Sequence, residues 1–170
     1  YHRTGLYRRA TGWPGFVTAV LTPNMARHYG LIPDGQRVFV VSECGSDAFW
    51  QAPLVEPASG PPLRLVGVGN VVPWKNWHLL LEALLGLPAE LRSQVEFELW
   101  GPTPNEPDAL AYAQELAALA ARPELAGRVH LRGATNDVIG VVRRANWFVL
   151  PSTNEPCSVA LIEALALGVP

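Results

Sequence analysis

The stretch Ser152-Thr-Asn-Glu155-Pro-Cys-Ser158-Val-Ala-Leu-Ile-Glu163-Ala-Leu-Ala-Leu-Gly168-Val-Pro170 decides how we interpret this chain. It follows the run Asn146-Trp-Phe-Val-Leu150, whose apolar residues predict a buried strand over 146–150. The stretch itself predicts a helix over 157–167, with Ser158 as its N-cap and Gly168 as its C-terminal stop. The apolar residues of this helix are Val159, Leu161, Ile162, Leu165 and Leu167.

Two carboxylates flank the start of this predicted helix. Glu155 lies in the turn before it, and Glu163 lies eight positions further on. Between them we expect unpaired backbone N–H groups and the positive end of the helix dipole, which together favour an anion. The pattern therefore suits a ligand with a phosphate core and hydroxyl-rich ends, such as a nucleotide sugar.

A known family carries this motif. Glu155-x7-Glu163, preceded by Leu-Pro-Ser152 and followed by Ala-Leu-Ala-Leu-Gly-Val-Pro170, resembles the donor site of retaining glycosyltransferases. The resemblance is greatest to the group 1 (family 4) enzymes of the GT-B fold, and it is best over residues 63–170. It implies that this part of the chain is a C-terminal, nucleotide-sugar-binding domain.

The composition agrees with a folded protein and excludes several classes. The chain has 170 residues, 49% hydrophobic and 16% charged, with a formal net charge of −2. Such a chain can bury a core, and it lacks the basic field that nucleic-acid binding requires. The two cysteines, Cys44 and Cys157, provide no disulfide framework and fit a reducing compartment.

The chain divides into two parts at a proline-rich segment. Residues 1–58 are expected to be the tail of an N-terminal, acceptor-binding domain and a linker, because 52–62 contains four prolines and a glycine. Within this tail we expect strands at 16–21 and 38–41, with a short helix between them that stops at Gly30. Residues 59–170 are expected to be the donor-binding domain, truncated at its C-terminus.

Strands and helices alternate strictly in this second part. The pattern predicts a Rossmann-like, doubly wound α/β fold in which parallel strands are covered on both faces and ligands bind at the carboxyl ends of the strands. The expected strands are 63–69, 95–100, 128–132 and 146–150, and the expected helices are 76–86, 107–122, 136–144 and 157–167.

The first strand of this domain ends in Gly67-Val-Gly69-Asn70-Val-Val-Pro-Trp74-Lys75-Asn76. The run resembles the family segment Gly-Arg-Leu-x-x-x-Lys-Gly, whose arginine and lysine hold the donor phosphates. Lys75 matches the lysine, whereas Asn70 stands at the arginine and Asn76 at the glycine. Two alternatives are a solvated lysine at a helix start and a dinucleotide-binding turn, which would need a glycine where Val72 stands.

The resemblance also implies roles for the other site residues. Glu163 would accept both ribose hydroxyls, and Glu155 would bind hydroxyls of the sugar and stabilise developing oxocarbenium charge. Glu155 and Lys75 are the expected catalytic residues. The expected donor-binding residues are Gly69, Asn70, Lys75, Gly101, Gly133, Ala134, Glu163 and the backbone N–H groups of Cys157, Ser158 and Val159.

We expect neither a metal nor a cofactor. The chain has no Asp-x-Asp motif, no histidine pair at ligand spacing and no Cys-x-x-Cys motif. Cys157 would need an adjacent base to act as a nucleophile, and the sequence supplies none. Trp100 and His130 are interpreted as core and strand residues rather than as ligands of a bound molecule.

The implied function is transfer of a hexose from a nucleotide sugar to a saccharide or lipid-linked acceptor, with retention of anomeric configuration, as in polysaccharide biosynthesis. Alternatives are an inactive nucleotide-sugar-binding module, or a sugar-nucleotide epimerase or phosphorylase of similar architecture. The expected partners are the donor and the acceptor, without nucleic acid. The expected location is cytoplasmic, with peripheral membrane association through the preceding domain left open.

Overall fold

The computed structural model describes residues 18–20, 23, 26–27, 30–33, 37–40, 45–54, 56, 60–153, 155 and 157–170. The chain forms two compact units. The first comprises residues 1–44 and 155–159, and the second comprises residues 45–154 and 160–170. Each unit is described separately below.

The first unit contains a small parallel sheet. Strand β1 (Thr18–Val20) pairs with β2 (Val38–Val40), and each lies within a strand that the sequence predicts. Gly30 has a φ of 66° and closes a helical turn, because its N–H bonds to the carbonyl of Arg27 and the next N–H bonds to that of Ala26. Gly30 is therefore the predicted stop. The polar opening 1–14 and Cys44 lie outside the described residues.

The second unit is built on a four-stranded parallel sheet in the order β5-β4-β3-β6. Its strands are β3 (Leu63–Val68), β4 (Val95–Trp100), β5 (Val129–Gly133) and β6 (Trp147–Phe148). All four lie within the predicted strands or one residue beyond them. Strand β6 is short, but Asn146 extends its alignment with β3 by exchanging two 2.8 Å hydrogen bonds with the backbone of Arg64.

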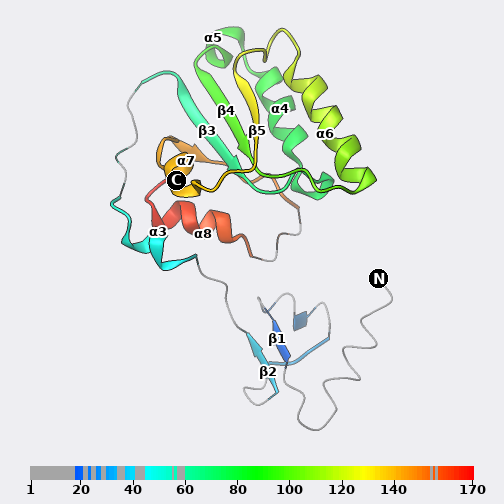
Figure 1. Ribbon diagram of the computed structural model, residues 1–170, viewed down its shortest axis with the longest axis vertical. Helices are drawn as coiled ribbons and strands as arrows, with labels where there is room; N and C mark the ends of the chain where they lie inside the picture. The colour runs from blue at the N-terminus through cyan, green and yellow to red at the C-terminus, as the bar shows by residue number, and fades with distance from the viewer. Residues whose placement is uncertain are drawn as a thin grey trace. The chain divides into compact units, whose positions relative to one another are not determined.

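Helices cover both faces of this sheet (Figure 1). The helices α4 (Trp77–Gly86) and α6 (Pro107–Ala120) cover one face, whereas α7 (Val138–Arg143) and α8 (Val159–Ala166) cover the other. The chain therefore changes face and direction between β3 and β6. This change marks a topological switch point, and ligands of such sheets bind at the carboxyl ends of the strands there. The predicted fold class is confirmed.

Each face has its own hydrophobic core. On the α4/α6 face the core is large and includes the fully buried Trp77, Leu81, Phe97 and Leu116. Each such side chain stabilises the fold by roughly 1.5–3 kcal/mol relative to an exposed one. Trp77, Leu81 and Leu84 form the buried face of α4.

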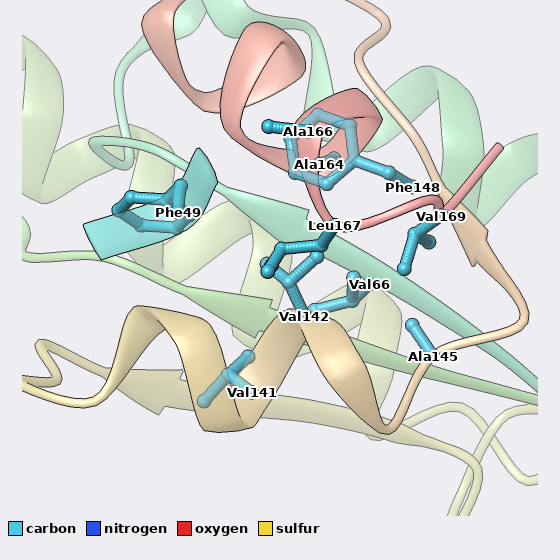
Figure 2. Packing of buried hydrophobic residues seen from close by; sticks show 10 residues of the cluster. All are labelled: Phe49, Val66, Val141, Val142, Ala145, Phe148, Ala164, Ala166, Leu167 and Val169. Carbon is cyan, nitrogen blue, oxygen red and sulfur yellow. The ribbon is translucent and has the colours of Figure 1, made fainter. Parts of the chain in front are cut away.

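The core on the α7/α8 face is made of smaller residues (Figure 2). Ala164, Ala166 and Leu167 are buried there, whereas Leu161 and Leu165 are 38% and 59% exposed. Small alanines allow α8 to approach the sheet closely, so the bulkier leucines lie on its outer side. Gly168, with φ 77°, ends α8 in a Schellman motif, as predicted: its N–H bonds to Leu165, and the next N–H bonds to Ala164.

Three short helices were not predicted. These are α3 (Asp47–Gln51), the 3₁₀ helix η1 (Pro73–Lys75) and α5 (Ala89–Arg92). The first of them inserts Phe49 into the core shown in Figure 2, beside Val142 and Leu167. No helix of the described ranges is both long and apolar enough to cross a membrane.

Candidate functional site

The loop after β3 lies at the switch point and carries three predicted site residues. It runs through Gly69 and Asn70 into η1, which ends at Lys75. A methyl group added at Gly69 would lie 3.7 Å from the Lys75 ammonium, so this cation sits beside the carboxyl end of β3. The same ammonium lies 4.6 Å from the ring centroid of Trp74, a cation–π contact.

Trp77 supports this loop from below. It is completely buried, and its indole N–H donates to the carbonyl oxygen of Asn70 at 3.1 Å. A Cβ atom at Gly67 would lie 2.7 Å from its ring, so Gly67 is required by the packing of Trp77. The backbone of Asn70 is therefore held by the core.

Asn76 joins this loop to the loop after β6. It is the one residue other than glycine with positive φ in the described part of the chain, at 55°. That conformation suits asparagine and glycine best, which explains why Asn76 can stand where the family motif has glycine. Its amide donates to the Pro151 carbonyl at 3.3 Å and to Thr153 Oγ1 at 3.1 Å. The N–H of Thr153 in turn donates to the Trp74 carbonyl at 3.2 Å.

The ends of β4 and β5 line the same edge of the sheet. The Gly69 N–H donates to the Trp100 carbonyl at 2.9 Å, and the Gly101 N–H donates to Gly133 at 2.8 Å. A Cβ atom at Gly101 would lie only 1.9 Å from the carbonyl oxygen of Gly69, whereas one at Gly133 would meet nothing within 4 Å. Gly133 and Ala134 are exposed. The structure thus brings Gly69, Asn70, Lys75, Gly101, Gly133 and Ala134 to one edge.

Trp100 and Arg132, near the ends of β4 and β5, both bond to the carboxylate of Glu98. The Trp100 indole donates to Glu98 at 3.1 Å, and Arg132 pairs with Glu98 at 2.7 Å. Burial alone would raise the pKa of Glu98, but the hydrogen bonds from Arg132 and Trp100 outweigh it and hold that pKa below its usual value. Trp100 is therefore a packed residue, in agreement with its interpretation from the sequence.

Glu163 lies on α8 in the second unit. A Cβ atom at Gly45 would come within 2.9 Å of its Cγ atom, so the side chain lies against the Gly45 backbone. Burial raises the pKa of its carboxyl above the usual value. A half-buried carboxylate in this condition gains from any ligand that donates hydrogen bonds to it.

The remaining predicted residues belong to the first unit. Glu155, Cys157, Ser158 and Val159 are grouped with residues 1–44. Val159 is the first residue of α8, so the predicted helix start shifts by two residues. The approach of Glu155 and of these N–H groups to Lys75 stays a prediction.

Two cavities of the structure are lined by none of the predicted site residues. One, of about 290 Å³, is lined by residues of α7 and by the first halves of β3 and β4, including Arg64, Glu96 and Arg144. The other, of about 430 Å³, lies between η1, α4 and α6 beside His78 and Tyr112. Among the described residues, no group of three or more His, Cys, Asp or Glu side chains could hold a metal ion.

The comparison with protein families assigns the second unit. The model of the family described as "Glycosyl transferases group 1" matches residues 62–170. The chain belongs to this family. The resemblance inferred from Glu155-x7-Glu163 and Lys75 is thus confirmed at the level of the family. A comparison with curated protein sequences gives no significant match.

Solved glycosyltransferase structures share the fold of this group 1 domain. Anabaena HepE in complex with UDP-glucose is 19% identical, with a TM-score of 0.77 over 100% of this chain and 48% of its own. WaaG, a glycosyltransferase of lipopolysaccharide biosynthesis, is 21% identical, with a TM-score of 0.70 over 98% and 46% of the two chains. TarM of S. aureus, in complex with UDP among other ligands, is 20% identical, with a TM-score of 0.67 over 91% and 29%. The chain thus spans about half the length of HepE and of WaaG, and less than a third of the length of TarM.

Three residues that shape the loop after β3 were not predicted as site residues. These are Trp74, Asn76 and Trp77, which hold Lys75 or its loop through the contacts given above. One signal could have identified Asn76: asparagine in place of glycine directly before a helix is typical of a left-handed residue. Trp77 was predicted only as part of the helix 76–86.

Proposed function

We propose that this domain binds a nucleotide-sugar donor at the carboxyl edge of its sheet. The observation that carries the proposal is the Lys75 ammonium beside Gly69, at the switch point of a group 1 glycosyl transferase domain. In the whole protein the bound sugar would pass to a saccharide or lipid-linked acceptor with retention of configuration. HepE with UDP-glucose and WaaG in lipopolysaccharide biosynthesis have the same fold and support this class of reaction.

Lys75 would offset the negative charge of the donor diphosphate. A flexible ammonium acts as a point charge with three donors, and such charge-assisted hydrogen bonds contribute about 1.5–3 kcal/mol. Asn70 stands where the motif has arginine, so it would add a polar contact without charge. The N–H groups of Cys157, Ser158 and Val159 at the start of α8 would complete the phosphate site.

The two glutamates would hold the two ends of the donor. The Glu163 carboxylate would accept both ribose hydroxyls, which would offset the cost of its burial. Glu155 would accept hydroxyls of the sugar and stabilise positive charge at the anomeric carbon. Gly133 and Ala134, exposed at the end of β5, would present backbone groups to the base.

The proposed reaction exchanges one bond at the anomeric carbon. The bond between the anomeric carbon and the distal phosphate oxygen breaks, a bond to the acceptor hydroxyl oxygen forms, and the hydroxyl proton passes to the departing phosphate group or through it to water. The nucleoside diphosphate leaves with added negative charge, which Lys75 and the α8 N-terminus would stabilise. In this proposal Lys75 and the α8 N-terminus take the role that a divalent metal ion would otherwise have.

A binding experiment tests the phosphate role of Lys75. Thermal shift and calorimetry would compare the full-length protein with UDP, GDP, ADP and dTDP, because specific binding raises the unfolding temperature. We expect one diphosphate to bind and Lys75→Met to weaken it about 10- to 100-fold. The control is Arg144→Met, which removes an exposed cation at the C-terminal end of α7, where no site residue is predicted. Equal affinity of Lys75→Met and wild type would contradict the proposal.

One observation keeps an inactive binding module as a second candidate. Asn70 removes a bidentate cation from the phosphate site, and the Asn70 carbonyl is occupied by Trp77. A labelled donor separates the two: a transferase would show donor hydrolysis or transfer that Glu155→Ala reduces. No turnover with tight donor binding would favour the binding module, whereas equal measurable turnover by wild type and Glu155→Ala would contradict the catalytic role of Glu155.

A further inference from the structure

We infer that Asn76 is a positioning residue, which acts on the donor diphosphate through Lys75. The inference rests on the proposed function and extends it to a residue that the family motif fills with glycine. Glycine could adopt the φ of 55° found at this position, but it could not donate the two side-chain hydrogen bonds that Asn76 makes.

These bonds fix the end of η1 against the loop after β6. The Asn76 amide reaches Pro151 and Thr153, and the Thr153 N–H returns to the Trp74 carbonyl. We call this closed set of three hydrogen bonds the Asn76 tether. It encloses Lys75 from both sides in the sequence, since Trp74 precedes that residue and Asn76 follows it.

The tether matters because Lys75 is a flexible cation. Ordering a free lysine side chain costs up to about 2 kcal/mol of conformational entropy, which reduces the affinity it can supply. In this chain the tether holds the residues on either side of Lys75, and the Lys75 ammonium rests 4.6 Å from the Trp74 ring centroid. Part of the ordering is therefore complete before a diphosphate binds.

The position of the tether in the site gives it a second consequence. Thr153, the partner of Asn76 in the tether, stands two positions before Glu155 in the sequence. Because Asn70 cannot supply the charge of the family arginine, Lys75 is the cation that this motif provides. A site with fewer cations depends more strongly on where its remaining cation lies.

The decisive experiment measures whether Asn76 acts through Lys75. We would determine the Kd of the full-length protein for whichever diphosphate binds, in wild type, Asn76→Gly, Lys75→Met and the double variant. Asn76→Gly keeps the left-handed backbone and deletes only the side-chain bonds. We expect it to weaken binding about 3- to 10-fold in wild type, and less than about 1.5-fold when Lys75 is already methionine.

Two further measurements exclude a merely structural effect. Thr153→Val removes one acceptor of the tether, so combining it with Asn76→Gly should add less than about twofold to the loss. The unfolding temperature without ligand should change little in Asn76→Gly, because glycine relieves the strain of the left-handed residue. Where turnover is measurable, the donor KM should rise more than kcat falls.

The possible failures are distinguishable. If Lys75→Met weakens binding but Asn76→Gly binds like wild type, the inference is wrong and the proposed function stands. An equal loss from Asn76→Gly in both backgrounds would also overturn the inference, since Asn76 would then act independently of Lys75. If Lys75→Met binds as tightly as wild type, the proposed phosphate site fails and the inference fails with it.

Discussion

The carboxyl ends of β3 and β5 lie at the same edge of one sheet but are built differently. The β3 end is crowded: Trp77 packs under Gly67 and Gly69, Gly101 presses against Gly69, and the Asn76 tether closes the loop. The β5 end is open, with Gly133 and Ala134 exposed. The proposed phosphate side is therefore preorganised by the core, and the proposed base side is presented by backbone in contact with solvent.

The largest effect should come from Gly101, at the crowded end. In Gly101→Ala the new Cβ would lie 1.9 Å from the Gly69 carbonyl oxygen, at a φ of 155°. Backbone must then shift, and we expect a loss of about 3 kcal/mol or more in the free energy of unfolding, measured by urea denaturation. Gly86→Ala is the control, because its Cβ would meet nothing within 4 Å and alanine favours helix. Equal stability of the two variants would mean that the β3 end is not crowded.

Gly133→Ala tests the open end in the same assay. The added Cβ has free space, so only the φ of 75° opposes it. We expect a loss of about 1–2 kcal/mol, the usual cost of a left-handed alanine. A loss as large as that of Gly101→Ala would remove the contrast between the two strand ends.

The sequence predicted the parts of this fold that depend on periodicity. The alternation of apolar strands with helices such as 77–86 is local, and it fixes a parallel sheet and the edge where ligands bind. It also predicted that Lys75, Gly101 and Gly133 lie at that edge, because each follows a strand.

What the sequence did not predict depends on contacts between distant segments. Asn76 meets Pro151 and Thr153, which are about 75 positions away, and nothing local announces that pairing. Phe49 joins a core whose other buried residues run from Val66 to Val169, so α3 did not stand out as part of it. Of the apolar residues predicted for the last helix, Leu167 is fully buried, but Leu161 and Leu165 are exposed, and the buried positions of α8 include Ala164 and Ala166.

The smallest effect concerns Glu163, which is crowded against Gly45 but carries a charge that burial disfavours. When the folded state raises the pKa of an acid, the protein loses stability as the pH rises from the pKa of the unfolded state to that of the folded state. Wild type should therefore be less stable than Glu163→Gln at pH 7 and equally stable below about pH 4, where both side chains are neutral. The difference should stay under about 1 kcal/mol, because the carboxylate keeps contact with solvent.

Glu163→Gln also separates the cost of this carboxylate from its use. If Glu163 accepts ribose hydroxyls, the variant without ligand should be more stable than wild type, but its affinity for a nucleoside diphosphate should be about 3- to 10-fold lower. Thermal unfolding of both proteins from pH 3 to pH 8, with and without the diphosphate, measures both effects together. A variant that gains stability and keeps full affinity would show that the burial of Glu163 serves packing against Gly45, and the ribose role would have to pass to another residue.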